Sequence, residues 1–202
     1  MCIRDRFSAG LDVPCLLALD RPELSAALDV FFGTISTLVA SHVPIAAAIT
    51  GHSPAGGAVL ALCCDRRVMA EGDFSIGLNE VQIGIPIPEI VAVLAQRTVG
   101  ARRAEDLCVT GRLVGPSKAL HLGLVDEVAP LDRVVETARN WCDQAVSMPS
   151  SALVETRARM RRDLVAQVER HREEDARRLS KTWFEPELQT AMKQLVARLK
   201  KA

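Results

Sequence analysis

Apolar residues near the start of the chain follow two patterns, one typical of a helix and one typical of a buried strand. After Asp20 and Pro22, which favour a helix start as cap and first-turn residue, apolar side chains recur at helical spacing and predict a helix to about Ser41. These apolar positions are Leu24, Leu28, Phe31, Ile35 and Leu38. The next apolar run, VPIAAAIT from Val43 to Thr50, is short and ends at a glycine, as a buried parallel strand does.

Strand and helix patterns then alternate as far as residue 128. We expect helices at 57–64, 88–99, 101–110 and 116–122, and strands at 67–70, 74–78 and 124–128. This alternation predicts an α/β architecture.

From residue 131 onward the pattern contains only helices, at 131–146, 150–181 and 186–200. The last one carries an apolar face, which predicts packing on the core or on another subunit. This face consists of Leu188, Met192, Leu195, Val196 and Leu199. We therefore divide the chain into an α/β core, residues 1–129, and a C-terminal helical region, residues 130–202.

Composition excludes several classes of function. The 202 residues hold 25 basic and 25 acidic side chains, so no net charge favours nucleic acid or an acidic membrane surface. The basic residues of the tail are interleaved with acids, which is typical of a solvated helix face. The six cysteines show no CxxC spacing, so we expect no metal site and no disulfide framework, and free thiols suit the cytoplasm. No segment has the pattern of a signal peptide or a membrane span.

The stretch GHSPAGGAVLAL, from Gly51, allows two chemical interpretations. Ser53 lies in a near match to the nucleophile turn of hydrolases, but the next residue is Pro54, which has no N–H to donate to an oxyanion. We expect His52 and Ser53 to line or support the turn instead. Gly56 and Gly57 open a helix, where unpaired N–H groups can bind a carbonyl oxygen that approaches a residue without a β-carbon. Alone, such a glycine pair is more often only a tight turn.

Two further stretches favour the oxyanion interpretation. FSAGLD (Phe7 to Asp12) and IGLNEVQIGIP (Ile76 to Pro86), together with HSPAGGAVLALCCDRRVMA, resemble the crotonase superfamily of enoyl-CoA hydratases and isomerases, and most closely its Δ3,Δ2-enoyl-CoA isomerase branch. The resemblance continues through VGARRAEDLCVTGRLVGPSKALHLGLVDEVAP into the tail. It implies a spiral of ββα units and a C-terminal helical region that forms trimers or hexamers. It also implies strands ahead of Phe7, and we expect these to be missing here, because MCIRDR is not typical of the strand expected at that place.

The resemblance assigns roles to particular residues. The backbone N–H groups of Leu11 and Gly56 would form an oxyanion hole for the thioester oxygen of an acyl-CoA, and Glu80 would be the single base. A buried carboxylate with a raised pKa suits that task, although a Glu between Asn and Val is, taken alone, more often a surface acid. Substrate contacts would come from five residues near these groups: Ala9, Asp12, Pro54, Gly57 and Leu78.

Val59 decides between the two reactions of the family. Members that hydrate a double bond generally carry a second glutamate at this position, and Val59 cannot move a proton. We therefore expect an isomerase that shifts a double bond from 3-enoyl-CoA to 2-enoyl-CoA in fatty-acid metabolism, with no metal or separate cofactor. An enoyl-CoA hydratase, or an inactive protein of the same fold, stays an alternative.

Overall fold

Two small parallel sheets form the centre of the protein. The computed structural model describes residues 5–199, and within them β1, β3 and β5 form one sheet in that order, while β2 pairs with β4 in a second. The strands are β1 (Ala46–Ile49), β2 (Ser53–Pro54), β3 (Arg66–Ala70), β4 (Ile76–Gly77) and β5 (Glu127–Ala129). Two successive units each add one strand to each sheet before a helix follows, which confirms the predicted spiral of ββα units.

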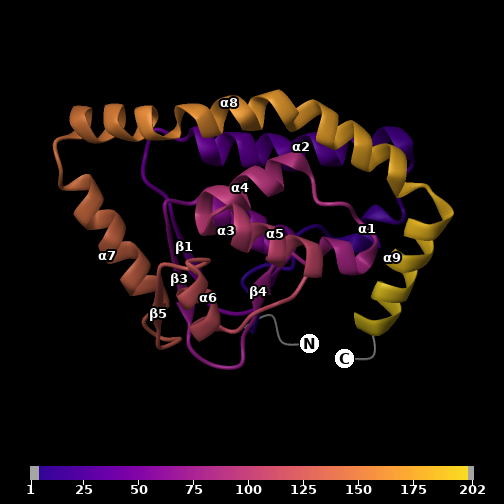
Figure 1. The fold of residues 1–202 in the computed structure, drawn as a ribbon, viewed down its shortest axis with the longest axis horizontal. Helices are drawn as coiled ribbons and strands as arrows, with labels where there is room; N and C mark the ends of the chain where they lie inside the picture. The colour runs from indigo at the N-terminus through magenta and orange to yellow at the C-terminus, as the bar shows by residue number, and fades with distance from the viewer. Residues whose placement is uncertain (1–4, 200–202) are drawn as a thin grey trace.

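Helices surround these sheets and make up most of the chain (Figure 1). They are α1 (Val13–Leu16), α2 (Arg21–Ala40), α3 (Gly56–Cys63), the 3-10 helix η2 (Glu80–Ile83), α4 (Glu89–Val99), α5 (Ala101–Thr110), α6 (Pro116–Leu122), α7 (Val134–Val146), α8 (Ser150–Trp183) and α9 (Pro186–Leu199). α8 runs along α2 across the top of the view, α7 flanks the three-stranded sheet, and α9 folds down at the opposite end.

Helix α2 begins where the sequence predicts, because Asp20 and Glu23 form a reciprocal capping box. The Asp20 carboxylate accepts from the Glu23 N–H at 2.9 Å, and the Glu23 carboxylate accepts from the Asp20 N–H at 3.0 Å. The buried face of the helix is Leu24, Leu28, Phe32, Ile35 and Val39. Phe31 and Leu38, which were predicted for this face, are only partly buried, and Phe32 and Val39 take their places.

The same helix qualifies the expectation that no segment resembles a membrane span. Among the described residues, α2 alone is long and apolar enough to cross a membrane by length and composition. In this structure its apolar face packs against α8 and α3. A core helix passes the same test of length and composition, so the observation is weak evidence for a span.

Helix α8 is attached to the core by charged side chains near each end. In its first half, Arg157 and Arg161 both pair with Asp65, and Arg161 also donates to the carbonyl oxygens of Val39 and Cys63. In its second half, the Asp175 carboxylate accepts from the N–H groups at the start of α4, at 3.2 and 2.9 Å. Because α8 and α9 share the hydrophobic core with the α/β part, the two regions pack as one body, and a domain division at residue 129 stays a prediction.

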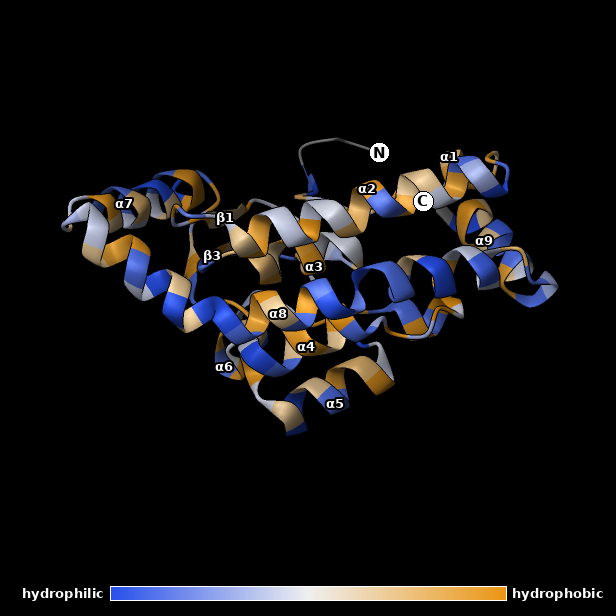
Figure 2. Ribbon diagram, turned by 90° about the horizontal axis from the view of Figure 1, so that it is seen from above, coloured by the Kyte–Doolittle hydropathy of each residue, from blue (hydrophilic) through white to orange (hydrophobic). Residues whose placement is uncertain are grey.

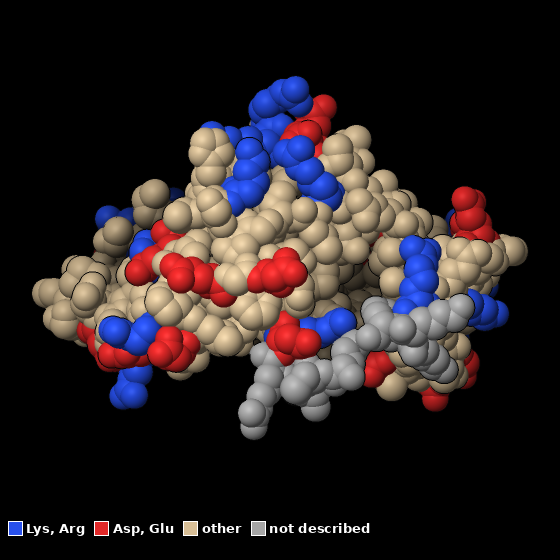
Figure 3. Space-filling model, turned by 90° about the horizontal axis from the view of Figure 1, so that it is seen from below, with Lys and Arg blue, Asp and Glu red and all other residues tan. Residues whose placement is uncertain are grey.

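The outward face of the tail is polar, as its interleaved charges predict. Arg159 pairs with Glu155, and Glu174 pairs with Arg177 and Arg178, all within α8. Viewed from above, α8 shows mostly hydrophilic residues while the adjacent α2 is much less hydrophilic (Figure 2). Seen from below, acidic and basic side chains lie in scattered groups with broad uncharged areas between them (Figure 3).

Three of the predicted strands are shorter in the structure, whereas β3 is one residue longer than predicted and the predicted helices agree to within about three residues. Pairing covers only residues 76–77 of the predicted strand 74–78, because its partner β2 is itself two residues long. The strand expected at 124–128 lies at 127–129 instead, since residues 124 and 125 are buried without joining the sheet. The prediction for the last helix extends to residue 200, which lies outside the described residues.

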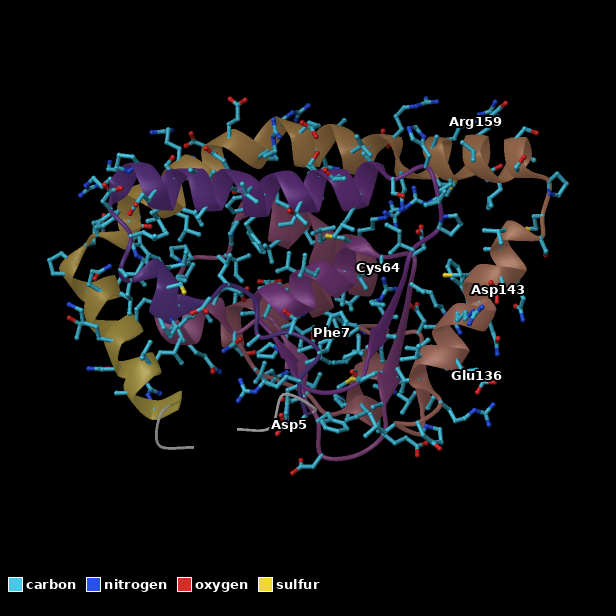
Figure 4. All side chains as sticks on the ribbon, turned by 180° about the vertical axis from the view of Figure 1, so that it is seen from behind. Asp5, Phe7, Cys64, Glu136, Asp143 and Arg159 are labelled. Carbon is cyan, nitrogen blue, oxygen red and sulfur yellow. The ribbon has the colours of Figure 1, made fainter. Side chains whose placement is uncertain are left out.

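Only Asp5 and Arg6 of the segment ahead of FSAG are described, and neither is part of a strand. Residues 1–4 lie outside the described part of the chain, but Arg6 forms an isolated parallel bridge with His52. In Figure 4, Phe7 lies near the centre of the view and Asp5 near its lower edge. An isolated bridge is not a strand, so Asp5 and Arg6 do not contradict the expectation that MCIRDR is no strand, and the other four residues lie outside the described part of the chain.

Candidate active site

Two glycine loops meet at the centre of the candidate site. A β-carbon on Gly10 would lie 2.8 Å from the N and Cα atoms of Gly56, and one on Gly56 would lie 2.8 Å from the Cα atom of Gly10. Gly10 also has φ = 81°, a conformation that other residues rarely adopt. Both loops therefore need glycine, because any side chain would separate their backbones.

The predicted oxyanion donors are both available at this contact. Gly56 is the first residue of α3, so its N–H has no acceptor within the helix, and the Leu11 N atom lies 3.5 Å from the β-carbon position of Gly56. Within residues 5–199, no group accepts a hydrogen bond from either N–H. The structure thus brings Leu11 and Gly56 together as two nearby, unpaired donors.

The residue before Gly56 is held in a strained conformation. Ala55 has φ = 48° and ψ = −123° and is the one non-glycine residue with positive φ in the described chain. Its N–H donates to the Gly77 carbonyl oxygen at 2.9 Å, which fixes the turn against β4. The turn is therefore set by the fold, and it starts α3 with the Gly56 N–H free.

Ser53 does not have the surroundings of a nucleophile. Its side chain is fully buried, and its Oγ atom has no hydrogen-bond partner among the described residues. A hydrolase serine needs a base within hydrogen-bond reach, and the Nδ1 atom of the adjacent His52 is engaged by Ser75. The hydrolase interpretation therefore finds no support in this geometry.

Glu80 enters the site through the pairing of β2 with β4. These strands are parallel, so the residues that follow each of them, Gly56 after β2 and Glu80 after β4, leave from the same edge of the pair. Glu80 begins η2 and is only 7% exposed, and its Oε2 atom has no hydrogen-bond partner in the described chain. A buried carboxylate with an unpaired oxygen is costly when ionised, so this group can accept and release a proton readily.

Burial sets the proton affinity of this carboxyl group. It raises the pKa of Glu80 from 4.5 to about 7, against a smaller lowering effect of the hydrogen bond from its own backbone N–H. Burial also raises the pKa of the nearby Cys108 thiol to about 11, and the charge of Glu80 adds to this effect. A base with a pKa near 7 can both take up and return a proton at neutral pH.

An apolar groove lies beside Glu80, between η2, α4 and α5. Its volume is about 390 Å³. Val81, the residue after Glu80, and Cys108 belong to its wall. The other lining residues are Ile87, Glu89, Ala92, Gln96, Ala104, Glu105 and Val109. This groove was not predicted from the sequence, because its walls come from separate helices whose packing the local pattern does not reveal.

The five residues predicted to contact substrate have different surroundings. Ala9 is exposed and Pro54 is half-buried, whereas Leu78 is only 1% exposed and packs in the core. Gly57 is buried, and a β-carbon there would lie 2.0 Å from the Ser8 carbonyl oxygen. Asp12 caps α1, where its carboxylate accepts from the Cys15 N–H at 3.0 Å. Substrate contact by these residues stays a prediction.

Two further features bear on the chemistry. Val59, where the resemblance predicts a second glutamate in hydratases, lies within α3 and is 1% exposed, as part of the core. Among the described residues, no group of three or more His, Cys, Asp or Glu side chains is arranged to hold a metal ion.

The architecture first defines the class of protein. The crystal structure of human mitochondrial delta3-delta2-enoyl-CoA isomerase superposes on it with a TM-score of 0.92 at 30% sequence identity, over 100% of this chain and 79% of that chain. The fold is therefore that of the crotonase superfamily, with its α/β core and C-terminal helical region.

Sequence comparison then gives the family. The model of the enoyl-CoA hydratase/isomerase family matches residues 3–202, and the chain belongs to this family. The mitochondrial enoyl-CoA delta isomerase 1 of Mus musculus is 35% identical over 164 residues, and that of Homo sapiens is 31% identical over 195. These alignments cover 81% and 96% of this chain, which spans 57% and 65% of the two relatives.

Proposed function

We propose that this protein is an enoyl-CoA isomerase that moves a double bond from the 3-position to the 2-position of an acyl-CoA. The observation that carries the proposal is the buried carboxyl group of Glu80, whose Oε2 atom is unpaired and whose pKa is raised to about 7. Glu80 follows the strand that pairs beside the glycine turn. The names of the two mammalian relatives support the same reaction.

The geometry suits a proton transfer between neighbouring carbons. The N–H groups of Leu11 and Gly56 hold the thioester oxygen, on which negative charge gathers when a proton leaves C2. Preorganised donors at such an oxygen are each worth a few kcal/mol in the transition state. Glu80 takes the C2 proton and returns a proton at C4, so that no net proton is gained or lost and the conjugated isomer leaves.

The apolar groove beside Glu80 accommodates hydrocarbon. Most of its lining side chains are apolar, and Val81 and Cys108 connect it to the base. We assign the substrate to the acyl-CoA thioesters of fatty-acid metabolism, with coenzyme A entering as part of the substrate. Further parts of the proposal are a cytoplasmic location, no separate cofactor, and assembly as trimers or hexamers through the helical tail.

Enoyl-CoA hydratase is the second candidate, because the family includes both reactions. Hydration benefits from a second carboxylate that activates water, and Val59 occupies the position expected for it. We therefore expect the protein to convert 3-enoyl-CoA to 2-enoyl-CoA faster than it hydrates 2-enoyl-CoA.

The direct test is to follow the absorbance of the conjugated thioester while purified protein acts on a 3-enoyl-CoA. The rate should rise with pH through about 7, because the base must be ionised to accept a proton, and Glu80→Gln should abolish turnover. Faster hydration than isomerisation would favour the hydratase. A folded protein without turnover, unaffected by the substitution, would indicate an inactive member of the fold.

A further inference from the structure

The main chain of His52 joins the two glycine loops. Its N–H donates to the Asp5 carbonyl oxygen at 2.9 Å, and its carbonyl oxygen accepts from the N–H groups of Phe7 at 2.9 Å and Ser8 at 3.4 Å. This one residue therefore holds the start of the loop that carries Leu11 against the turn that carries Gly56.

The side chain of His52 joins the same turn to the segment that carries the base. Its Nδ1 atom accepts from the Ser75 N–H at 3.1 Å, and the Ser75 hydroxyl lies at the same distance. The next residue, Ser53, donates its N–H to the Ser75 carbonyl oxygen at 2.8 Å. Both main-chain groups of Ser75 are thus bound by residues 52 and 53, and the imidazole also packs edge-on against Phe74, with ring centroids 5.5 Å apart.

Each of the three segments carries its reacting group a few residues after this junction. Leu11 follows Phe7 by four residues, Gly56 follows His52 by four, and Glu80 follows Ser75 by five. We propose that His52 is a positioning residue that fixes the base segment relative to the two oxyanion donors. The expected effect of His52 on turnover rests on the proposed function. The hydrogen bonds of His52 are independent of that function.

The hydrogen bond from the Ser75 N–H also fixes the tautomer of the His52 imidazole. A backbone N–H can only donate, so Nδ1 must present its lone pair to Ser75, and the ring proton lies on Nε2. A side chain of similar size without an acceptor at this position leaves the Ser75 N–H unpaired. The segment from Ser75 to Glu80 then loses one of its attachments to the glycine turn, while the pairing of β2 with β4 remains. Displacements of about 1 Å in an active site can cost about 100-fold in rate.

Two substitutions separate positioning from packing. His52→Phe keeps a flat ring that can pack against Phe74 but removes the acceptor. His52→Asn gives up the ring but can present an amide oxygen at about the place of Nδ1. His42→Phe, at an exposed histidine between α2 and β1, is the matched control.

Two measurements on the full chain give the outcome: amide hydrogen exchange at Ser75, and kcat and KM with a 3-enoyl-CoA. His52→Phe should speed exchange at Ser75 at least tenfold and lower kcat by about 10- to 100-fold with KM within about threefold, and His52→Asn should restore both to near the wild-type values. Unchanged exchange at Ser75 in His52→Phe, or equal losses of kcat and unfolding temperature in both variants, would overturn the proposal. If the wild type shows no turnover but exchange responds as expected, the positioning contact stands and the isomerase function fails.

Discussion

Replacing Glu80 with Gln should stabilise the protein, and increasingly so as the pH rises. Burial raises the pKa of Glu80 to about 7, so between pH 4.5 and 7 the folded state keeps a proton that the unfolded state has released. Rising pH therefore favours unfolding over this interval, and the cost becomes constant above it. The interval corresponds to about 3 kcal/mol, at about 1.4 kcal/mol for each pKa unit.

Glutamine has nearly the same shape and carries no charge at any pH, so the variant escapes this cost. We expect Glu80→Gln to exceed the wild type in unfolding free energy by less than about 1 kcal/mol at pH 5 and by about 3 kcal/mol at pH 8.5. Urea unfolding followed by the fluorescence of the buried Trp183 measures both proteins, and all other titrating groups cancel in the difference. Glu155→Gln, on the exposed face of α8, controls for the loss of one negative charge. A difference that does not grow with pH would refute the reasoning.

Three further predictions concern packing and specificity. Gly56→Ala should lower kcat about 100-fold or more, because the new β-carbon forces the two glycine loops apart. Gly33→Ala is the control: its β-carbon meets nothing closer than 3.9 Å, so it should add up to about 1 kcal/mol of stability to α2. Arg161→Ala should cost about 3 kcal/mol in urea unfolding, since it removes a buried partner of a carboxylate, and the exposed Arg159→Ala should change stability by less than about 0.5 kcal/mol. Ala92→Trp should fill the groove beside the base and lower turnover of long-chain substrates at least tenfold more than that of short-chain ones; an equal loss for both would assign the groove another role.

Helix boundaries could be predicted well because their signals are local. The cap at Asp20 and the glycines that end α5 and α6 lie next to the residues they terminate. Strand lengths were predicted less well, because they depend on how far a distant partner extends.

The candidate site shows the same division between local and distant causes. The glycine contact between the two loops follows from residue types that the sequence displays, whereas nothing local marks Glu80 as buried. Its environment comes from the packing of η2 against α5 and α9, helices that begin more than twenty residues later. The neighbouring groove, the strain at Ala55 and the imidazole contact to Ser75 likewise exist only once distant segments meet.

The attachment of α8 has a consequence for biosynthesis. Its partners α2 and Asp65 leave the ribosome roughly a hundred residues before Arg161, and α4 emerges long before Asp175 reaches its first turn. Until then α3 covers only part of the apolar side of α2, so the nascent chain exposes apolar surface through most of its translation. A chaperone that binds apolar segments would cover this surface until α8 has been synthesised.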